Sequence, residues 1–333
     1  MATAYGGAEV LEVTDVDVPD PGEGELVVDI RAAAYNPADW KIYGGLWGRD
    51  PDALPRLVGL EGAGVVSAVG PGSSFAVGDP VVLYPASGTF AERVLVRESG
   101  VVPMPLGVAW DVAAGTLLTG VTAWHALDAV GLGESGPGIA GSGGDELAGA
   151  GPGGSQHGAD GEHRGEVLLV HGGAGGVGAV VVQLAVLRGA RVIATAGASN
   201  HEYLRSLGAE PVAYGDGLAE RVRAIGGVTA AIDTVGTHEA IDVSVELVAD
   251  RLRVATVAGL EHGAERGVLL LGHGPGMDAG REIRAAARGP LLELVASGRL
   301  QVRVAQVFPL DRVREAHELI VSGHARGKVV LLP

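Results

Sequence analysis

The first third of the chain consists of short segments with alternating apolar and polar positions, separated by Gly, Pro and Asp turns. Alternation with a period of two, bounded by turn residues, predicts β-strands. The expected strands are residues 9–13, 25–33, 62–69, 80–83 and 91–96. A series of short strands of this kind is typical of an all-β, barrel-like unit.

From about Trp110 the apolar residues recur at helical spacing, at Ala113, Leu117, Leu118, Val121 and Trp124. Strands and helices then alternate to about residue 295, which is the pattern of a doubly wound parallel sheet. The expected strands are 167–170, 191–196, 230–234 and 252–258, and the expected helices include 119–130 and 179–188. The tail predicts a helix at 310–322 and a strand at 329–332 that pairs back into the first unit.

These patterns predict an α/β chain with two domains. One comprises residues 1–115 and is completed by residues 296–333, and the other comprises residues 116–295. The second domain carries a low-complexity insertion at 133–165, which contains 13 glycines and few apolar side chains. We expect that insertion to be loosely ordered or disordered. A role as a lid or partner-binding loop is disfavoured because the segment lacks aromatic anchors.

A glycine turn follows the strand at 167–170 and leads into the helix at 179–188. Read as G-x-G-x-x-G, it uses Gly173, Gly175 and Gly178. Without Cβ atoms these positions allow a tight turn, close approach of backbone N–H groups to a pyrophosphate, and close packing of helix on strand. The strand before it, the helix after it and a further strand at βαβ spacing together predict a dinucleotide site.

The end of the next strand indicates which dinucleotide binds. An NAD site usually carries a carboxylate about 20 residues beyond the first glycine, where it binds the ribose 2′-hydroxyl. No Asp or Glu stands in the stretch Ile193 to His201. A 2′-phosphate is therefore not repelled, and Ser199, Asn200, His201 and Tyr214 could donate hydrogen bonds to it. The sequence favours NADP(H), although no Arg or Lys lies in residues 197–201.

Composition and charge narrow the class of protein. The formal net charge of −16 disfavours nucleic acid and anionic membranes as partners, since both attract basic surfaces. No long uncharged apolar stretch and no signal-peptide pattern is found, so we expect a cytoplasmic protein. The chain has no cysteine, which excludes disulfides, thiol nucleophiles and every zinc site with Cys ligands. The ten histidines show no metal-binding spacing, and no metal site is predicted.

Seven stretches of the sequence resemble the zinc-independent medium-chain dehydrogenases/reductases, in their quinone oxidoreductase-like (zeta-crystallin-like) branch. Besides the glycine turn, the matching stretches are residues 4–11, 36–41, 59–66, 69–79, 122–127 and 323–330. The resemblance implies a GroES-like β-barrel domain built from both chain ends, a Rossmann domain between them, a small-molecule substrate bound at their junction, and a homodimer.

The resemblance also implies chemistry without zinc. Where the zinc branch has a Cys and a His as ligands, this chain has Asn36 and Leu60. The expected reaction is hydride transfer from NADPH to a quinone or an α,β-unsaturated carbonyl, such as an enone or enoyl substrate, in which the protein stabilises the oxygen that gains charge. Lys41 is the first candidate for that role and Tyr43 the next donor. Lys41 could equally be a surface lysine.

By resemblance, the cofactor contacts fall in four groups. Asn36 and Thr122 lie near the nicotinamide, and Gly175, Gly176 and Val177 bind the pyrophosphate. Residues Gly197, Ser199, His201 and Tyr214 surround the adenosine phosphate. Thr234, Ala258 and Gly259 form the last group and follow the later strands. Glu61 is not a cofactor contact, because the resemblance implies an interior structural residue there. Two other functions stay open, namely a non-redox tailoring enzyme or cyclase on the same fold and a structural protein that only holds the nucleotide.

Overall fold

The computed structural model describes residues 1–133 and 165–333. These residues form two compact units, one of Met1–Gly120 with Leu294–Pro333 and one of Val121–Glu293. We call them unit 1 and unit 2. The glycine-rich insertion expected at 133–165 lies outside the described residues except for its two ends.

A seven-stranded sheet forms the body of unit 1. Its strands are β1 (Glu25–Tyr35), β2 (Gly62–Val69), β3 (Pro80–Leu83), β4 (Arg93–Arg97), β5 (Val101–Pro103), β12 (Val304–Pro309) and β13 (Lys328–Leu332). The order is β12-β13-β1-β2-β3-β5, and β4 also pairs with β1. The first residues of β1 pair with β4 and its last residues with β13, so one long strand joins the two ends of the chain.

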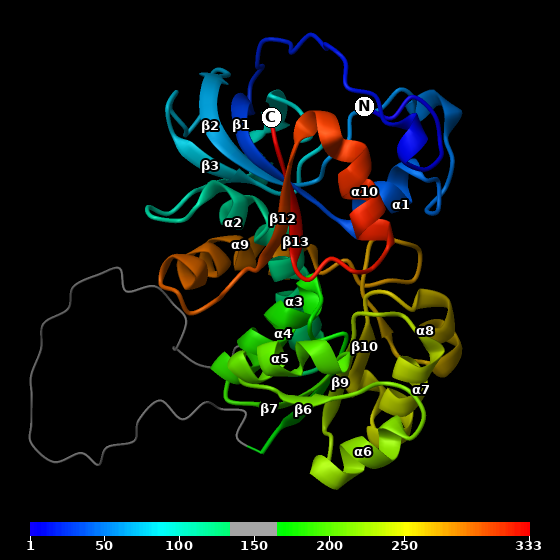
Figure 1. Ribbon diagram of the computed structural model, residues 1–333. Coiled ribbons are helices and arrows are strands. Elements are labelled where there is room, and N and C mark those ends of the chain that lie inside the picture. The colour runs from blue at the N-terminus through cyan, green and yellow to red at the C-terminus, as the bar shows by residue number, and fades with distance from the viewer. Residues whose placement is uncertain (134–164) are drawn as a thin grey trace, which may run out of the picture. The chain divides into compact units, whose positions relative to one another are not determined.

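Three helices belong to unit 1: α1 (Pro37–Tyr43), α2 (Trp110–Ala114) and α10 (Val313–Val321). The core of the unit includes residues of the sheet, of α1 and of α10, among them Leu26, Tyr35, Tyr43, Phe308 and Val313. Figure 1 shows the C-terminal strand and helix α10, in red and orange, beside the blue strand β1. The tail therefore pairs back into the first unit, as the sequence predicts.

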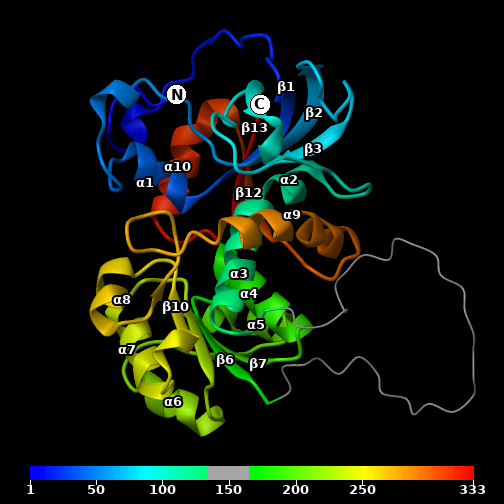
Figure 2. The same ribbon diagram turned by 180° about the vertical axis from the view of Figure 1, so that it is seen from behind.

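Unit 2 is built on a parallel six-stranded sheet with the order β11-β10-β9-β6-β7-β8. The strands are β6 (Val167–His171), β7 (Arg191–Thr195), β8 (Glu210–Val212), β9 (Ala230–Asp233), β10 (Val254–Thr256) and β11 (Leu269–Leu270). Its helices are α4 (Gly176–Leu187), α5 (His201–Ser206), α6 (Leu218–Ile225), α7 (His238–Leu247) and α8 (Leu260–Arg266). Figures 1 and 2 show α4 and α5 beside β6 and β7, with α7 and α8 toward β10.

Two further helices contain the positions in the sequence at which one unit ends and the other begins: α3 (Leu117–Ala129) and α9 (Arg281–Ala296). Helix α3 is close to the expected helix at 119–130. The overall class is confirmed: a GroES-like β-unit accompanies a Rossmann-type parallel sheet.

Several expected elements are wrong in extent or type. Residues 9–13 do not form a strand: a 3₁₀ helix covers Ala8–Val10 and Leu11 makes only an isolated bridge to Ala2. The Glu9 carboxylate accepts the N–H of Gly7 at 2.8 Å, and such local bonds favour a turn over a strand. The strand expected at 252–258 is shortened in the same way, because the Asp250 side chain accepts the N–H of Leu252 and a 3₁₀ turn precedes β10.

Candidate cofactor site

The glycine turn lies at the carboxyl end of β6, where the order of the parallel sheet reverses. Strands β7 and β8 extend to one side of β6, and β9, β10 and β11 extend to the other. Ligands of open α/β sheets bind at such a switch point, outside the carboxyl ends of the strands. Helix α4 begins at Gly176, directly after the turn, so its first N–H groups point toward this edge.

The glycines of the turn are required for different reasons. A Cβ on Gly178 would lie 2.2 Å from the carbonyl oxygen of Gly172, and one on Gly173 would lie 2.7 Å from the Cβ of Ala194. These two positions allow close packing inside the protein. A Cβ on Gly175 would meet only the Gly172 oxygen, at 3.3 Å, and Gly175 is exposed. The space in front of Gly175 is therefore open to a ligand.

Threonine and histidine side chains fix the end of β7 next to the turn. The Thr195 hydroxyl accepts the N–H of Gly172 at 3.1 Å, and the Thr195 carbonyl accepts the N–H of Gly173 at 3.0 Å. The His201 ring lies 3.2 Å from the carbonyl oxygen of Ala196. Tyr214 is 64% exposed, and its hydroxyl lies 3.8 Å from the position of a Cβ on Gly197. Ser199 is exposed in the same loop.

The residues expected after β9 and β10 lie in two adjoining loops. The Thr234 hydroxyl donates to the carbonyl of His171 at 2.7 Å, which joins the end of β9 to the glycine turn. The N–H groups of Ala258 and Gly259 both donate to the Thr256 hydroxyl, at 3.1 and 2.9 Å. The structure thus brings Thr234 to the same sheet edge as the turn, while the backbone of 258–259 is held from within its own loop.

His171, the last residue of β6, is buried directly beneath the turn. It pairs across the sheet with Asp233 of β9. Burial lowers the pKa of His171 to about 4, although the Asp233 carboxylate opposes the shift. The ring is therefore neutral at pH 7, and its Nε2 has no hydrogen-bond partner in the described part of the chain.

Thr122, expected near the nicotinamide, lies on α3 and contacts a polar cluster within unit 2. The His125 ring is fully buried, with its Nε2 3.0 Å from Asp278 and its Nδ1 3.3 Å from the Arg284 guanidinium. Arg284 also reaches the Thr122 hydroxyl at 3.5 Å. This cluster fixes α3 against the start of α9.

In unit 1, Asn36 belongs to a buried polar network. Its side-chain N–H groups donate to Glu61 at 3.0 Å and to the carbonyl of Ala34 at 3.2 Å. Lys328 donates to Glu61 at 2.7 Å and also to the Asn36 side-chain oxygen. The second Glu61 oxygen accepts the N–H of Leu118 at 2.8 Å. Glu61 is fully buried, as expected of an interior residue, and Lys328, at the chain end, neutralises it.

The two candidates for catalysis on α1 have different surroundings. Lys41 is half-buried, and its ammonium lies 6.0 Å from the centre of the Trp47 ring. Tyr43 is fully buried, and its hydroxyl bonds with Tyr35 and with His317 Nδ1. Burial raises the pKa of Tyr43 above its usual value. Of the two residues, only Lys41 is partly exposed.

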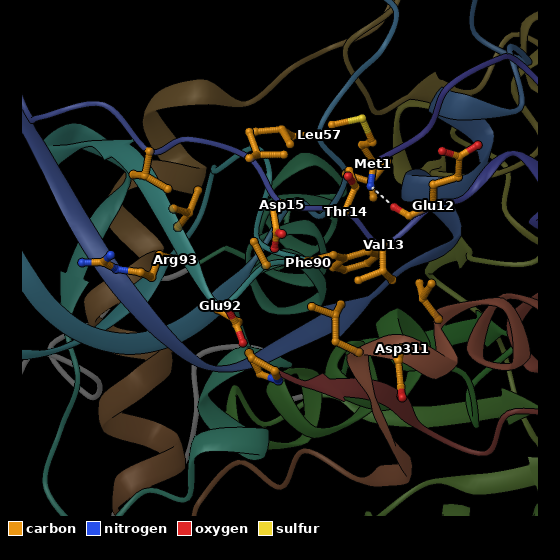
Figure 3. A pocket seen from close by; sticks show the side chains of 18 of the residues that line it. Met1, Glu12, Val13, Thr14, Asp15, Leu57, Phe90, Glu92, Arg93 and Asp311 are labelled. Carbon is orange, nitrogen blue, oxygen red and sulfur yellow. Dashed lines mark hydrogen bonds between the residues drawn. The ribbon is translucent and has the colours of Figure 1, made fainter.

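A groove of about 1340 Å³ opens elsewhere on unit 1 (Figure 3). The segment 11–19, the residues 90–95 and the chain end at 332–333 line it. The amino group of Met1 donates to the carbonyl of Glu12 at 2.6 Å at its rim. None of the expected site residues lines this groove.

Residues 1–133 and 165–333 contain neither a cluster of metal-binding side chains nor a membrane-spanning helix. In that part of the chain, His, Cys, Asp and Glu residues nowhere gather in groups of three or more that could hold a metal ion. In the same ranges, no helix is long and apolar enough to span a membrane.

Comparison with known proteins identifies the family. Residues 22–106 match the alcohol dehydrogenase GroES-like domain, and residues 207–331 match a domain described as zinc-binding dehydrogenase. Quinone oxidoreductase 1 of Escherichia coli strain K12 is 28% identical over 350 residues, which cover 99% of this chain and 97% of that protein. The chain belongs to the quinone oxidoreductase-like medium-chain dehydrogenases/reductases. It is an oxidoreductase.

Two solved structures support the same placement. A mycobacterial protein in complex with NADPH is 29% identical with a TM-score of 0.80, covering all of this chain and 98% of that one. The Escherichia coli quinone oxidoreductase in complex with NADPH is 27% identical with a TM-score of 0.78, covering 99% of this chain and 98% of that one.

Sequence reasoning missed the buried side chains that hydrogen-bond to the loops of the candidate site. Asp233, Thr256 and Thr195 each end a parallel strand and hold the loops that carry the expected contacts. Their position at strand ends beside glycines was the available signal. The expected residues Asn36, Lys41 and Tyr43 belong to unit 1, and the other expected site residues belong to unit 2.

Proposed function

We propose that this chain is an NADPH-dependent reductase of quinones or α,β-unsaturated carbonyl compounds that works without zinc. The observation that carries the proposal is the glycine turn at the switch point of the parallel sheet, open to a ligand at Gly175 and followed at once by the N-terminus of α4. Two similar structures hold NADPH, and a similar protein is a quinone oxidoreductase.

The residues of this chain fit NADPH by their chemistry. The first N–H groups of α4, at Gly176, Val177 and Gly178, suit a pyrophosphate because a helix N-terminus favours negative charge. Gly197, Ser199, His201 and Tyr214 would surround the 2′-phosphate, with no carboxylate in residues 197–201 to repel it. Thr122, Thr234, Ala258, Gly259 and Asn36 are the proposed positions on the nicotinamide side.

When bound, the reduced nicotinamide supplies a hydride to the electrophilic carbon of the acceptor. The oxygen conjugated to that carbon then gains negative charge. We assign Lys41 to this oxygen, because its ammonium is a fixed positive charge whose interaction strengthens as the charge develops. Tyr43, whose hydroxyl is buried against Tyr35 and His317, would position α1 rather than reach the substrate.

A panel assay tests the proposal. The chain is mixed with NADPH and a series of quinones and enones, and the loss of NADPH absorbance is followed. We expect turnover with members of one or both classes, and we expect prior dialysis against a chelator to leave kcat unchanged. Absence of NADPH oxidation with every acceptor would count against a reductase. Loss of activity on chelation, restored by zinc, would contradict the zinc-independent mechanism.

A further inference from the structure

We propose that Asp233 is a positioning residue for the nicotinamide half of the cofactor, because its buried carboxylate holds the loops after β9 and β10 in one fixed arrangement. The inference rests on the proposed function, since it concerns the NADPH site. Asp233 would touch neither cofactor nor substrate and would act through the backbone that it holds.

The Asp233 carboxylate binds both loops directly. One oxygen accepts the N–H of Val235 at 2.9 Å, and the N–H of Gly236 is shared between both oxygens at 3.0 and 3.1 Å, which fixes the loop after β9. The other oxygen accepts the Thr256 hydroxyl at 2.7 Å, at the end of β10. Asp233 is 1% exposed, so these donors take the place of water. Bonds to a buried charged group are stronger than those between neutral groups.

Thr256 connects Asp233 to Ala258 and Gly259, the residues expected at the nicotinamide. Its hydroxyl donates its single proton to Asp233 and accepts the N–H groups of Ala258 and Gly259. A hydroxyl has one donor and two acceptor sites, and all three are used here. The backbone of 258–259 is therefore held by a relay that ends on the Asp233 carboxylate.

The two loops also touch each other, backbone against backbone. Gly236 has a φ of +84°, and a Cβ there would lie 2.9 Å from the Gly259 nitrogen. On the other side, Thr234 ties the loop after β9 to the carbonyl of His171, directly before the glycine turn. The turn, the loop after β9 and the loop after β10 thus form one hydrogen-bonded edge, with Asp233 at its centre.

The substitution Asp233→Asn tests the relay with almost no change in volume. The Asn oxygen can still accept the N–H groups of Val235 and Gly236, but its amide nitrogen would face Thr256. The Thr256 hydroxyl already accepts two N–H groups, so it cannot also accept the amide. Thr256→Val removes the same relay from the other side, and Thr256→Ser is the matched control that keeps the hydroxyl.

The measurement is the affinity of the full chain for two ligands, by calorimetry. One is NADPH, and the other is ADP-ribose 2′-phosphate, which lacks the nicotinamide. We expect Asp233→Asn and Thr256→Val to weaken NADPH binding on the order of tenfold, while binding of the fragment changes by less than about twofold. Thr256→Ser should match the wild type for both ligands.

The possible results distinguish a failure of the proposed role of Asp233 from a failure of the proposed function. Equal losses for NADPH and the fragment, or no loss for either, would overturn the role of Asp233 while leaving the cofactor site intact. Failure of the wild-type chain to bind NADPH would overturn the proposed function and this inference together. If Asp233→Asn does not fold, the comparison of Thr256→Val with Thr256→Ser decides by the same criterion.

Discussion

Replacing Gly178 with alanine should destabilise unit 2, whereas the same change at Gly175 should weaken cofactor binding alone. The added Cβ at 178 would lie 2.2, 2.8 and 2.9 Å from the Gly172 oxygen, the Gly172 carbon and the Gly173 Cα. All three are backbone atoms of the turn, so no side chain can rotate away. The turn or the start of α4 must move instead.

The expected size of the effect follows from two opposing contributions. Alanine inside a helix is favoured over glycine by about 1 kcal/mol. Overpacking against fixed atoms costs about 1–3 kcal/mol, and more when the contact is as short as this one. We expect Gly178→Ala to lose about 2 kcal/mol net, which lowers the Tm by roughly 4–8 °C for a unit of this size.

Gly175→Ala is the matched control. Its Cβ would meet one protein atom at 3.3 Å, so the fold should keep its Tm within about 2 °C. The methyl group would instead project toward a bound pyrophosphate and weaken NADPH binding by about 1 kcal/mol or more. Thermal melts and NADPH titrations of the three proteins provide the measurement. A Gly178→Ala protein as stable as the wild type, or a Gly175→Ala protein with full NADPH affinity, would refute the reasoning.

Three further predictions concern the charge at and near the site. Lys41→Met should lower kcat by about 10²-fold on an enone, with NADPH affinity unchanged, because one donor to the developing charge is lost; full kcat would mean that Lys41 only packs on Trp47. Gly197→Asp should fold, since only the Tyr214 hydroxyl lies near its Cβ, and should reverse the preference for NADPH over NADH through repulsion of the 2′-phosphate, as cofactor titrations would show. Burial raises the pKa of Asp39 from 3.8 to about 7, so the folded state disfavours the ionised carboxylate. The free energy of unfolding therefore falls as the pH rises from 3.8 to about 7. Asp39→Asn should therefore gain up to about 4 kcal/mol relative to the wild type near pH 8, and little near pH 4, in denaturant melts; an equal gain at both values would contradict this assignment.

The elements that the sequence predicts well are those whose boundaries have a local cause. Strands β2 and β3 match the expected residues because Gly, Pro and Asp turns end them on both sides. The glycine turn and its flanking strand and helix are equally local. The short strands β5, β8, β11 and β12 were missed, since two to six residues carry too little pattern and their pairing depends on partners far along the chain.

The residues of the candidate site also differ in whether the sequence alone predicts them. The turn could be read from spacing, because its glycines act within a few residues of one another. The network of Asn36, Glu61 and Lys328 could not, because Lys328 is 267 residues from Glu61 and sequence pattern gives no sign that a lysine is buried. Asp233 is similar, since its carboxylate gains its role only when β10 lies beside β9.

The pairing of β13 with β1 has a consequence for how the chain is made. Strand β1 (Glu25–Tyr35) is synthesised long before its partner β13 (Lys328–Leu332), so the sheet of unit 1 cannot be completed until residues 328–332 have left the ribosome. Unit 2 is one uninterrupted stretch, Val121–Glu293, and can fold while the tail is still being added. Until then the last residues of β1 pair with β2 alone and their other edge lacks β13, and the buried Glu61 lacks the Lys328 ammonium that neutralises it. A chain truncated before residue 328 should therefore retain a folded unit 2 beside a first unit that stays open and prone to aggregate.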